Sequence, residues 1–100
     1  MYKLRFTPAA QDDFDAIESY IADDNPVKAY EFVRFLIDKI NILSDFPLIG
    51  VEESVVGSGL PNSRKLIIKN YIAHYTIFEK ENIIAITRIL HGAKQNYKLV

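Results

Sequence analysis

The sequence of 100 residues contains no cysteine and only four glycines and four prolines. Without thiol groups the chain can form neither disulfide bonds nor thiolate metal sites, which is compatible with a reducing compartment. Its first residues lack the apolar core of roughly 7–15 residues that a signal peptide needs. No apolar run approaches the roughly 20 residues of a membrane-spanning helix. We therefore expect a cytoplasmic protein with no membrane segment.

Glycine is also too sparse for a nucleotide-binding loop. The best candidate, Gly57-Ser58-Gly59, lacks a third glycine and a helix after it, which excludes the usual phosphate-binding motif. We therefore expect no nucleotide cofactor. The length predicts a single domain, residues 1–100, whose one core lies between two layers.

Charge is nearly balanced over the whole chain, at a net −1, but it is unevenly distributed. From Met1 to Gly59, five Lys and Arg residues stand against eleven Asp and Glu residues, a net of −6. From Leu60 to Val100, seven stand against two, a net of +5. An asymmetry of this kind steers an anionic partner toward the basic half.

The first part of the sequence predicts a strand followed by a helix. Apolar and polar residues alternate from Tyr2 to Thr7, which is the period of a half-buried strand. Thr7 is a good helix N-cap, and Pro8 suits the first helical position. An apolar stripe at helical spacing follows, made of Ala10, Phe14, Ile17 and Ile21. We interpret the acidic residues of the same helix as a solvated face, not a metal or acid–base site: Asp12, Asp13, Asp15 and Glu18.

A second helix is predicted after Asp24-Asn25-Pro26, and Asp45-Phe46-Pro47 ends it. Its apolar stripe has 4-3-4-3 spacing and consists of Ala29, Val33, Leu36, Ile40 and Leu43. The short joint between the helices predicts an antiparallel helical hairpin. After it, residues 47 to 63 read as a loop long enough to be functional.

Three short apolar runs complete the sequence: Arg64–Lys69, Tyr71–Phe78 and Ile83–Leu90. Their β-branched and aromatic residues, separated by turn-forming polar residues, predict an antiparallel meander. The predicted fold is therefore α+β in the order β-α-α-β-β-β, an antiparallel sheet with the helical hairpin packed on one face. Because one hairpin covers only one face, and the last two runs are apolar on both sides, we expect the second face to meet a partner chain or a target.

The two histidines do not indicate a metal site. His74 alternates with Ile72 and Thr76, which is typical of a strand residue whose hydrogen bonds are satisfied. With two histidines and no cysteine, a zinc site would need distant carboxylates, so we expect none.

Several short motifs occur in a fixed order along the chain. They are Pro8, Asn25-Pro26-Val27-Lys28-Ala29, Phe46-Pro47-Leu48-Ile49-Gly50, Tyr71-Ile72-Ala73-His74-Tyr75 and Arg88-Ile89-Leu90-His91-Gly92-Ala93-Lys94. In this order the sequence resembles the RelE/ParE superfamily of toxins from bacterial type II toxin–antitoxin pairs, and the ParE-like branch in particular. One departure is that the ending reads Ala93-Lys94-Gln95, where ParE-like sequences usually continue with Arg. Lysine keeps the positive charge but lacks the two-pronged hydrogen bonding of arginine.

The resemblance implies one of two activities. RelE-like members look like ribosome-dependent mRNA endonucleases, which need groups to position RNA, neutralise phosphate charge and transfer protons. Here those groups would be Arg64 and Arg88 for charge, and His91 and Tyr97 for protons. ParE-like members look like DNA gyrase inhibitors, which bind a topoisomerase–DNA complex and perform no chemistry. For that activity we expect a target-binding surface made of Arg88, His91, Lys94, Tyr97 and Lys98.

The composition favours gyrase inhibition. An RNA-gripping domain usually has a pI above about 9, whereas this sequence has a pI of 6.1. Plain structural roles also compete with the catalytic ones. Arg88, expected on the strand face of Ile84 and Ile86, could pair with an acidic neighbour, and His91 could cap its strand. The nuclease, and a non-toxic binding module of the same fold, remain the alternatives.

The resemblance also implies a partner. Toxins of this superfamily look like the globular half of a complex in which a largely disordered antitoxin tail folds across the toxin. An acidic tail with apolar anchors would complement the basic half and the uncovered sheet face. We therefore expect a cognate antitoxin and a hetero-oligomer.

Overall fold

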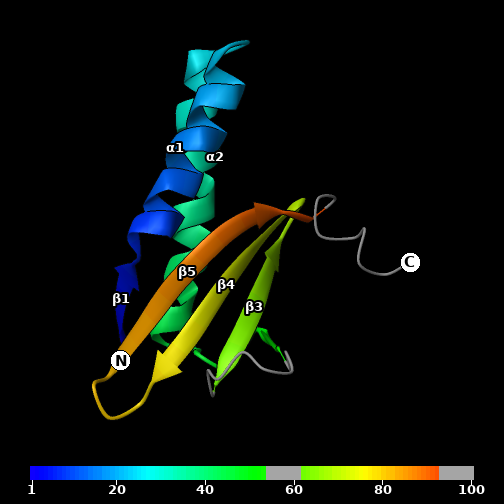
Figure 1. Ribbon diagram of the computed structural model, residues 1–100. Coiled ribbons are helices and arrows are strands. Elements are labelled where there is room, and N and C mark those ends of the chain that lie inside the picture. The colour runs from blue at the N-terminus through cyan, green and yellow to red at the C-terminus, as the bar shows by residue number, and fades with distance from the viewer. Residues whose placement is uncertain (54–61, 93–100) are drawn as a thin grey trace.

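The computed structural model describes residues 1–53 and 62–92 and shows two helices packed on one face of a mixed sheet (Figure 1). The helices are α1 (Pro8–Ala22) and α2 (Pro26–Ile40), and a short 3-10 helix, η1 (Asn41–Ser44), follows α2. The strands are β1 (Lys3–Phe6), β2 (Val51–Glu52), β3 (Ser63–Ile68), β4 (Tyr71–Phe78) and β5 (Ile83–His91). The predicted α+β architecture, with a helical hairpin on one face of the sheet, is confirmed. Within the described residues no helix is long and apolar enough to span a membrane.

Both helices begin where the sequence predicts. The Thr7 side chain accepts a hydrogen bond from the Ala10 amide, and the Asn25 side chain accepts one from the Lys28 amide. In each case proline occupies the start of the helix, where its missing N–H costs nothing. The capping residue and the proline after it therefore determine where each helix of the hairpin begins.

The sheet has the order β1-β5-β4-β3-β2, and it differs from the prediction in two respects. First, β1 pairs in parallel with β5, from Lys3 opposite Ile83 to Phe6 opposite Ile86, so the sheet is mixed. The chain between them contains the hairpin and the other three strands, so it is long enough for the crossover that parallel neighbours require. Second, Val51 and Glu52, which the sequence placed in a loop, form the short edge strand β2 beside β3.

The core lies between the hairpin and one face of the sheet. The interior strands β4 and β5 contribute directly opposed residues to this face, and these residues form one cluster with buried side chains of α1 and α2. The largest fully buried side chains are Tyr75, Leu36, Ile40, Leu43, Ile84 and Ile86. We call the other side of the sheet, which neither α1 nor α2 covers, the open face.

Leu36 tests the predicted helical register, because its side chain is fully buried in the middle of α2. We expect Leu36→Ala to lower the free energy of unfolding by about 2–5 kcal/mol, as truncation of a buried leucine leaves a cavity. The measurement is denaturant unfolding. Val27→Ala, on the same helix but 67% exposed, is the control and should stay within about 0.5 kcal/mol of the parent. A loss below about 1 kcal/mol for Leu36→Ala would contradict this packing.

Candidate functional site

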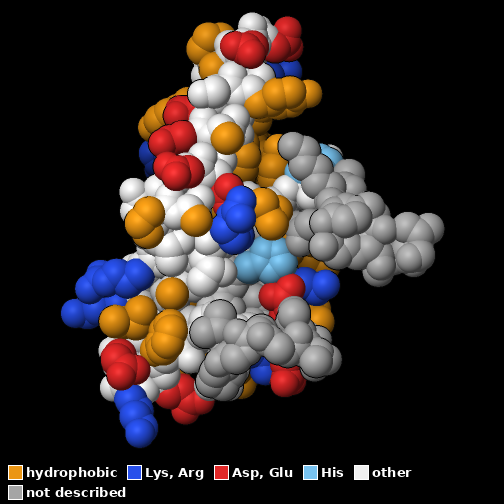
Figure 2. All heavy atoms as spheres, in the orientation of Figure 1, with side chains coloured by type: hydrophobic (Ala, Val, Ile, Leu, Met, Phe, Trp, Pro, Cys, Tyr) orange, Lys and Arg blue, Asp and Glu red, His pale blue; other side chains and the backbone are white. Residues whose placement is uncertain are grey.

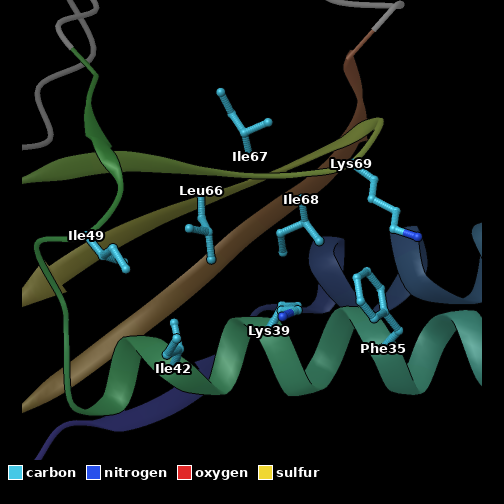
Figure 3. A pocket seen from close by; sticks show the side chains of 8 residues that line it. All are labelled: Phe35, Lys39, Ile42, Ile49, Leu66, Ile67, Ile68 and Lys69. Atoms are coloured by element: carbon cyan, nitrogen blue, oxygen red, sulfur yellow. The ribbon is translucent and has the colours of Figure 1, made fainter.

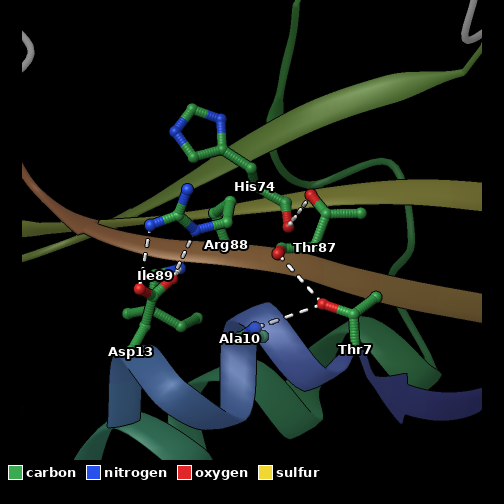
Figure 4. Close-up of polar contacts among 7 residues, drawn as sticks. All are labelled: Thr7, Ala10, Asp13, His74, Thr87, Arg88 and Ile89. Carbon is green, nitrogen blue, oxygen red and sulfur yellow. Dashed lines mark hydrogen bonds and ion pairs between the residues drawn. The ribbon is translucent and has the colours of Figure 1, made fainter. Parts of the chain in front are cut away.

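The side chain of Arg88 is held by an acidic residue of α1 (Figure 4). Its Nε and Nη2 donate to the two carboxylate oxygens of Asp13, at 2.8 and 3.0 Å. The same carboxylate accepts a hydrogen bond of 2.8 Å from the backbone N–H of Ile89. The interpretation of Arg88 as a partner of an acidic neighbour is therefore confirmed. Asp13, by contrast, does not belong to a solvated face, since only 14% of its side chain is exposed.

A β-bulge decides where Arg88 points. His74 lies opposite Arg88, but the next residue of β4, Tyr75, lies opposite Ile86, which leaves Thr87 as an extra residue. Ile86 is buried on the helix side, so the expectation that Arg88 shares its face is wrong. The bulge places Arg88 opposite His74 on the open face instead, where 48% of its side chain is exposed.

Hydrogen bonds connect the bulge to β4 and to the start of α1 (Figure 4). The Thr87 hydroxyl donates to the carbonyl of His74 at 3.1 Å. The carbonyl of Thr87 accepts a 3.0 Å hydrogen bond from the hydroxyl of Thr7. The Thr7 hydroxyl also caps α1 by accepting from Ala10. One threonine thus links the start of α1 to the bulge of β5.

Arg64 lies on the helix side of the sheet and supports a loop. It pairs across the strands with the buried Tyr75, and its Nη1 donates to the carbonyls of Gly50 and Leu48 at 2.8 and 3.3 Å. Its guanidinium therefore holds the backbone that follows η1, which is a structural role that the sequence did not predict.

His91 ends β5 on the same side of the sheet as Arg64 but far from it. It lies opposite Tyr71, with the two rings in edge-to-face contact at 5.1 Å between centroids. Tyr71 and Tyr75 are four strand positions apart, which corresponds to about 13 Å. Arg64 and His91 are therefore separated along the sheet.

The described residues do not bring the predicted catalytic set together. Arg64 and His91 lie on the helix side at different ends, and Arg88 lies on the open face. Lys94, Tyr97 and Lys98 fall outside the described residues. Within the described parts of the chain, no group of three or more His, Asp and Glu could hold a metal ion.

A cross-strand row of basic side chains occupies the open face. Lys65 of β3 lies opposite His74 of β4, which lies opposite Arg88 of β5. Directly opposed residues project from the same face, so the three side chains form one line across the sheet. The Nδ1 of His74 lies 3.0 Å from a carboxylate oxygen of Glu53, so the prediction of a satisfied strand residue is confirmed. Figure 2 shows this face, with a histidine near its centre and both basic and acidic side chains around it.

The sequence does not reveal that Lys65 belongs to this row or that Glu53 is a partner of His74. Strand periodicity predicts which residues of the same strand share a face with Lys65 or with His74. Only the pairing register of β3 and β4 shows that these two residues are neighbours. The register in turn depends on the Lys69-Asn70 turn and on the bulge, which local patterns do not specify.

Comparisons with known proteins agree with this architecture. The family model described as the ParE toxin of the type II toxin–antitoxin system parDE matches residues 4–96. The chromosomal ParDE toxin–antitoxin system of P. aeruginosa contains a chain that is 26% identical, with a TM-score of 0.72, covering 91% of this chain and 96% of that one. These matches confirm the resemblance to the ParE-like branch. No curated protein sequence matches.

Two further solved structures support the fold alone, because their identities are low. One is the RelBE2 toxin–antitoxin complex of Mycobacterium tuberculosis, at 23% identity and a TM-score of 0.62, covering 90% of this chain and 96% of that one. The other is the isolated E. coli RelE toxin, at 13% identity and a TM-score of 0.65, covering all of both chains.

The contact between Asp13 and β5 predicts a pH-dependent contribution to stability. Burial by itself raises the pKa of Asp13, but hydrogen bonds from Arg88 and Ile89 and the charge of Arg88 bring that pKa below its ordinary value. The folded state therefore favours the carboxylate, and its contribution is lost as the pH falls below about 4. Asp13→Asn should lower the free energy of unfolding at pH 7 by about 1.5–3 kcal/mol. The free energy of unfolding of this variant should also decrease less, between pH 7 and acid pH, than that of the parent.

Denaturant unfolding between pH 2.5 and 7 measures both effects. Asp15→Asn is the matched control, since Asp15 is an exposed acid of the same helix. Equal losses for the two variants, with the same pH profile, would contradict the specific role of Asp13.

Proposed function

The chain belongs to the ParE toxin family of type II toxin–antitoxin systems, and we propose that its toxicity arises from binding and blocking DNA gyrase. The observation that carries this proposal is the dispersal of Arg64, Arg88 and His91, the described members of the catalytic set that the resemblance implies for a nuclease. Arg88 is engaged by Asp13, Arg64 is engaged by the loop after η1, and the two lie on opposite faces of the sheet. Binding a target requires a surface but no convergence of reactive groups on one phosphate.

The charge distribution supports a binding surface on the sheet side. The acidic residues are concentrated in the half that contains the hairpin, and Lys3, Arg5, Lys65 and Arg88 lie at open-face positions of β1, β3 and β5. We infer that this face and the C-terminal residues Lys94, Tyr97 and Lys98, together with His91, contact the gyrase–DNA complex. Gyrase acts on chromosomal DNA, so the site of action would be the cytoplasm.

A cognate antitoxin is the second partner that we propose. The P. aeruginosa relative is part of a ParDE toxin–antitoxin system. A toxin of this family would be held inactive by such a partner until the partner is removed. The antitoxin would also stabilise the toxin by mass action, because it binds only the folded state.

One observation favours a second candidate function, a ribosome-dependent mRNA endonuclease. Glu53 orients the imidazole of His74 within the basic row, and a carboxylate-oriented histidine beside Lys65 and Arg88 has the elements of an acid–base site. A binding module of the same fold without toxicity is the remaining alternative.

A supercoiling assay with purified gyrase and antitoxin-free toxin distinguishes these functions. We expect relaxed or cleaved plasmid where untreated gyrase gives supercoiled plasmid. Normal supercoiling together with cutting of ribosome-bound mRNA would support the nuclease instead. Normal supercoiling without mRNA cutting or growth arrest would indicate the non-toxic module.

Substitutions at the C-terminal residues sharpen the test. Charge reversal of Lys94 and Lys98 should weaken gyrase inhibition, with the largest effect at low salt, because salt screens the attraction between positive side chains and an anionic target. Lys28→Glu, an exposed lysine at the start of α2, is the control and should have no such effect. Tyr97→Phe should be nearly silent, since it keeps the ring and no proton transfer is required. A Tyr97→Phe variant that folds and binds antitoxin but is no longer toxic would overturn the proposal.

A further inference from the structure

The loop between η1 and β2 exposes large apolar side chains on a rigidly held backbone. Leu48 and Ile49 are 65% and 54% exposed, and Phe46 and Val51 are exposed to a similar degree. Exposed apolar residues scattered singly are ordinary, but a contiguous set marks an interaction surface. We call residues 46–51 the apolar loop.

Two side chains from the sheet fix the backbone of the apolar loop. The buried Tyr75 hydroxyl donates to the carbonyl of Pro47 at 2.7 Å and accepts from the Gly50 N–H at 3.0 Å. Arg64 donates to the carbonyls of Leu48 and Gly50. Burial raises the pKa of Tyr75 above its ordinary value, which keeps the phenol neutral and able to donate. The loop backbone is thus bonded on its inner side while its apolar side chains stay outside.

Gly50 allows the close approach that this arrangement needs. A Cβ atom at this position would lie 2.5 Å from the Tyr75 hydroxyl oxygen and 2.7 Å from the carbonyl oxygen of Lys65. Any side chain at residue 50 would therefore push the loop away from β3 and β4. The position of the loop depends on the absence of that side chain.

The apolar loop borders an open groove of about 300 Å³ between α2 and β3 (Figure 3). The apolar lining consists of Phe35, Ile42, Ile49, Leu66, Ile67 and Ile68. Two lysines complete the lining, and both place their Nζ over the ring of Phe35: Lys39 at 5.6 Å and Lys69 at 4.8 Å from its centroid. The groove therefore has an apolar floor and a positively charged rim.

The outer edge of β3 forms one wall of this groove. β2 pairs with Arg64 and Lys65, and among the described residues no strand pairs with this edge from Leu66 onward. An unpaired edge offers backbone N–H and C=O groups to an added strand. Ile67, which is 60% exposed, lies on this segment.

We propose that the groove and the apolar loop together bind an extended partner segment that carries alternating large apolar and acidic side chains. Its backbone would pair with β3 at residues 66–69, its apolar side chains would contact Ile49 and Phe35, and its carboxylates would meet Lys39 and Lys69. A second copy of this chain fits less well, because both copies would bring the same lysines to the contact. The inference rests on the proposed function, because the cognate antitoxin proposed there is the partner that we expect to carry this segment.

The inference gives Arg64 a positioning role. Its guanidinium would not touch the partner but would hold the apolar loop in the bound position in advance, which lowers the entropic cost of binding. This surface lies at the edge of β3 and is distinct from the open face and the C-terminal residues assigned to the target.

The experiment uses the toxin co-expressed and purified with the antitoxin from the adjoining gene. Hydrogen–deuterium exchange should show antitoxin-dependent protection of amides in residues 46–51 and 66–69. Ile49→Asp should raise the Kd for the antitoxin at least 10-fold and leave gyrase inhibition unchanged. Val27→Asp is the matched control: Val27 is also an exposed apolar residue, at 67%, but lies at the start of α2, and the Kd of this variant should not change.

Two loop variants test the positioning role. Gly50→Ala and Arg64→Gln should each raise the Kd and speed amide exchange of Ile49 in the antitoxin-free toxin. Arg64→Lys, which keeps a donor, should recover part of the affinity. A role confined to overall stability would instead shift the melting temperature without this recovery and without a local change in exchange.

The remaining outcomes count against the inference. If the complex forms but protection lies elsewhere, or Ile49→Asp binds as tightly as the parent, the groove is not the antitoxin site and the proposed function survives. If Ile49→Asp only dissociates a toxin homodimer, the occupant is a second copy. If no complex forms, the antitoxin part of the proposed function fails together with this inference.

Discussion

The structure depends on how the backbone N–H and C=O groups along the outer edge of β5, after Ile86, find hydrogen-bond partners. On its outer edge β5 pairs with β1 only from Ile83 to Ile86, and among the described residues no strand continues along this edge, while β4 pairs with the other edge up to His91. Side chains of α1 and its cap take over, since Thr7 bonds to the carbonyl of Thr87 and Asp13 accepts from the amide of Ile89. Buried or half-buried backbone groups must find partners. The position of α1 against the sheet therefore follows from the hydrogen bonding of β5.

Features coded by neighbouring residues could be predicted from the sequence. The caps at Thr7 and Asn25, the stripe around Leu36 and the three final strands each depend on residues within one or two turns. The sequence does not predict the parallel pairing of β1, the bulge at Thr87 or the contact between Glu53 and His74. Each joins segments far apart in sequence, where periodicity carries no information about register. For the same reason, the sequence offers Arg64 only as a charge stabiliser for the nuclease alternative, whereas its partners in the structure are the carbonyls of a distant loop.

The two proposed interaction surfaces use different parts of one sheet. The open face and the C-terminal residues are basic and would contact the target, whereas the edge of β3 and the apolar loop would contact the antitoxin. Tyr75 and Arg64, which pair across β4 and β3, support the loop from the helix side, while His74 and Lys65, their sequence neighbours, form the basic row. Alternation along adjacent strands thus places the side chains that support the apolar loop and the basic row on opposite sides of the sheet.

The extra residue in β5 has a consequence for how relatives of this chain align. In a regular strand the residues after Ile86 would alternate so that Arg88 pointed inward and Ile89 outward, and the additional Thr87 reverses this. In a relative whose β5 has no bulge, the residues aligned with Arg88 and Ile89 would point to the same faces as here only if the strand were one residue shorter between Ile86 and Arg88. A single-residue gap opposite Thr87 is therefore the expected mark of such relatives, and their Thr7 would lose the carbonyl to which it is joined here.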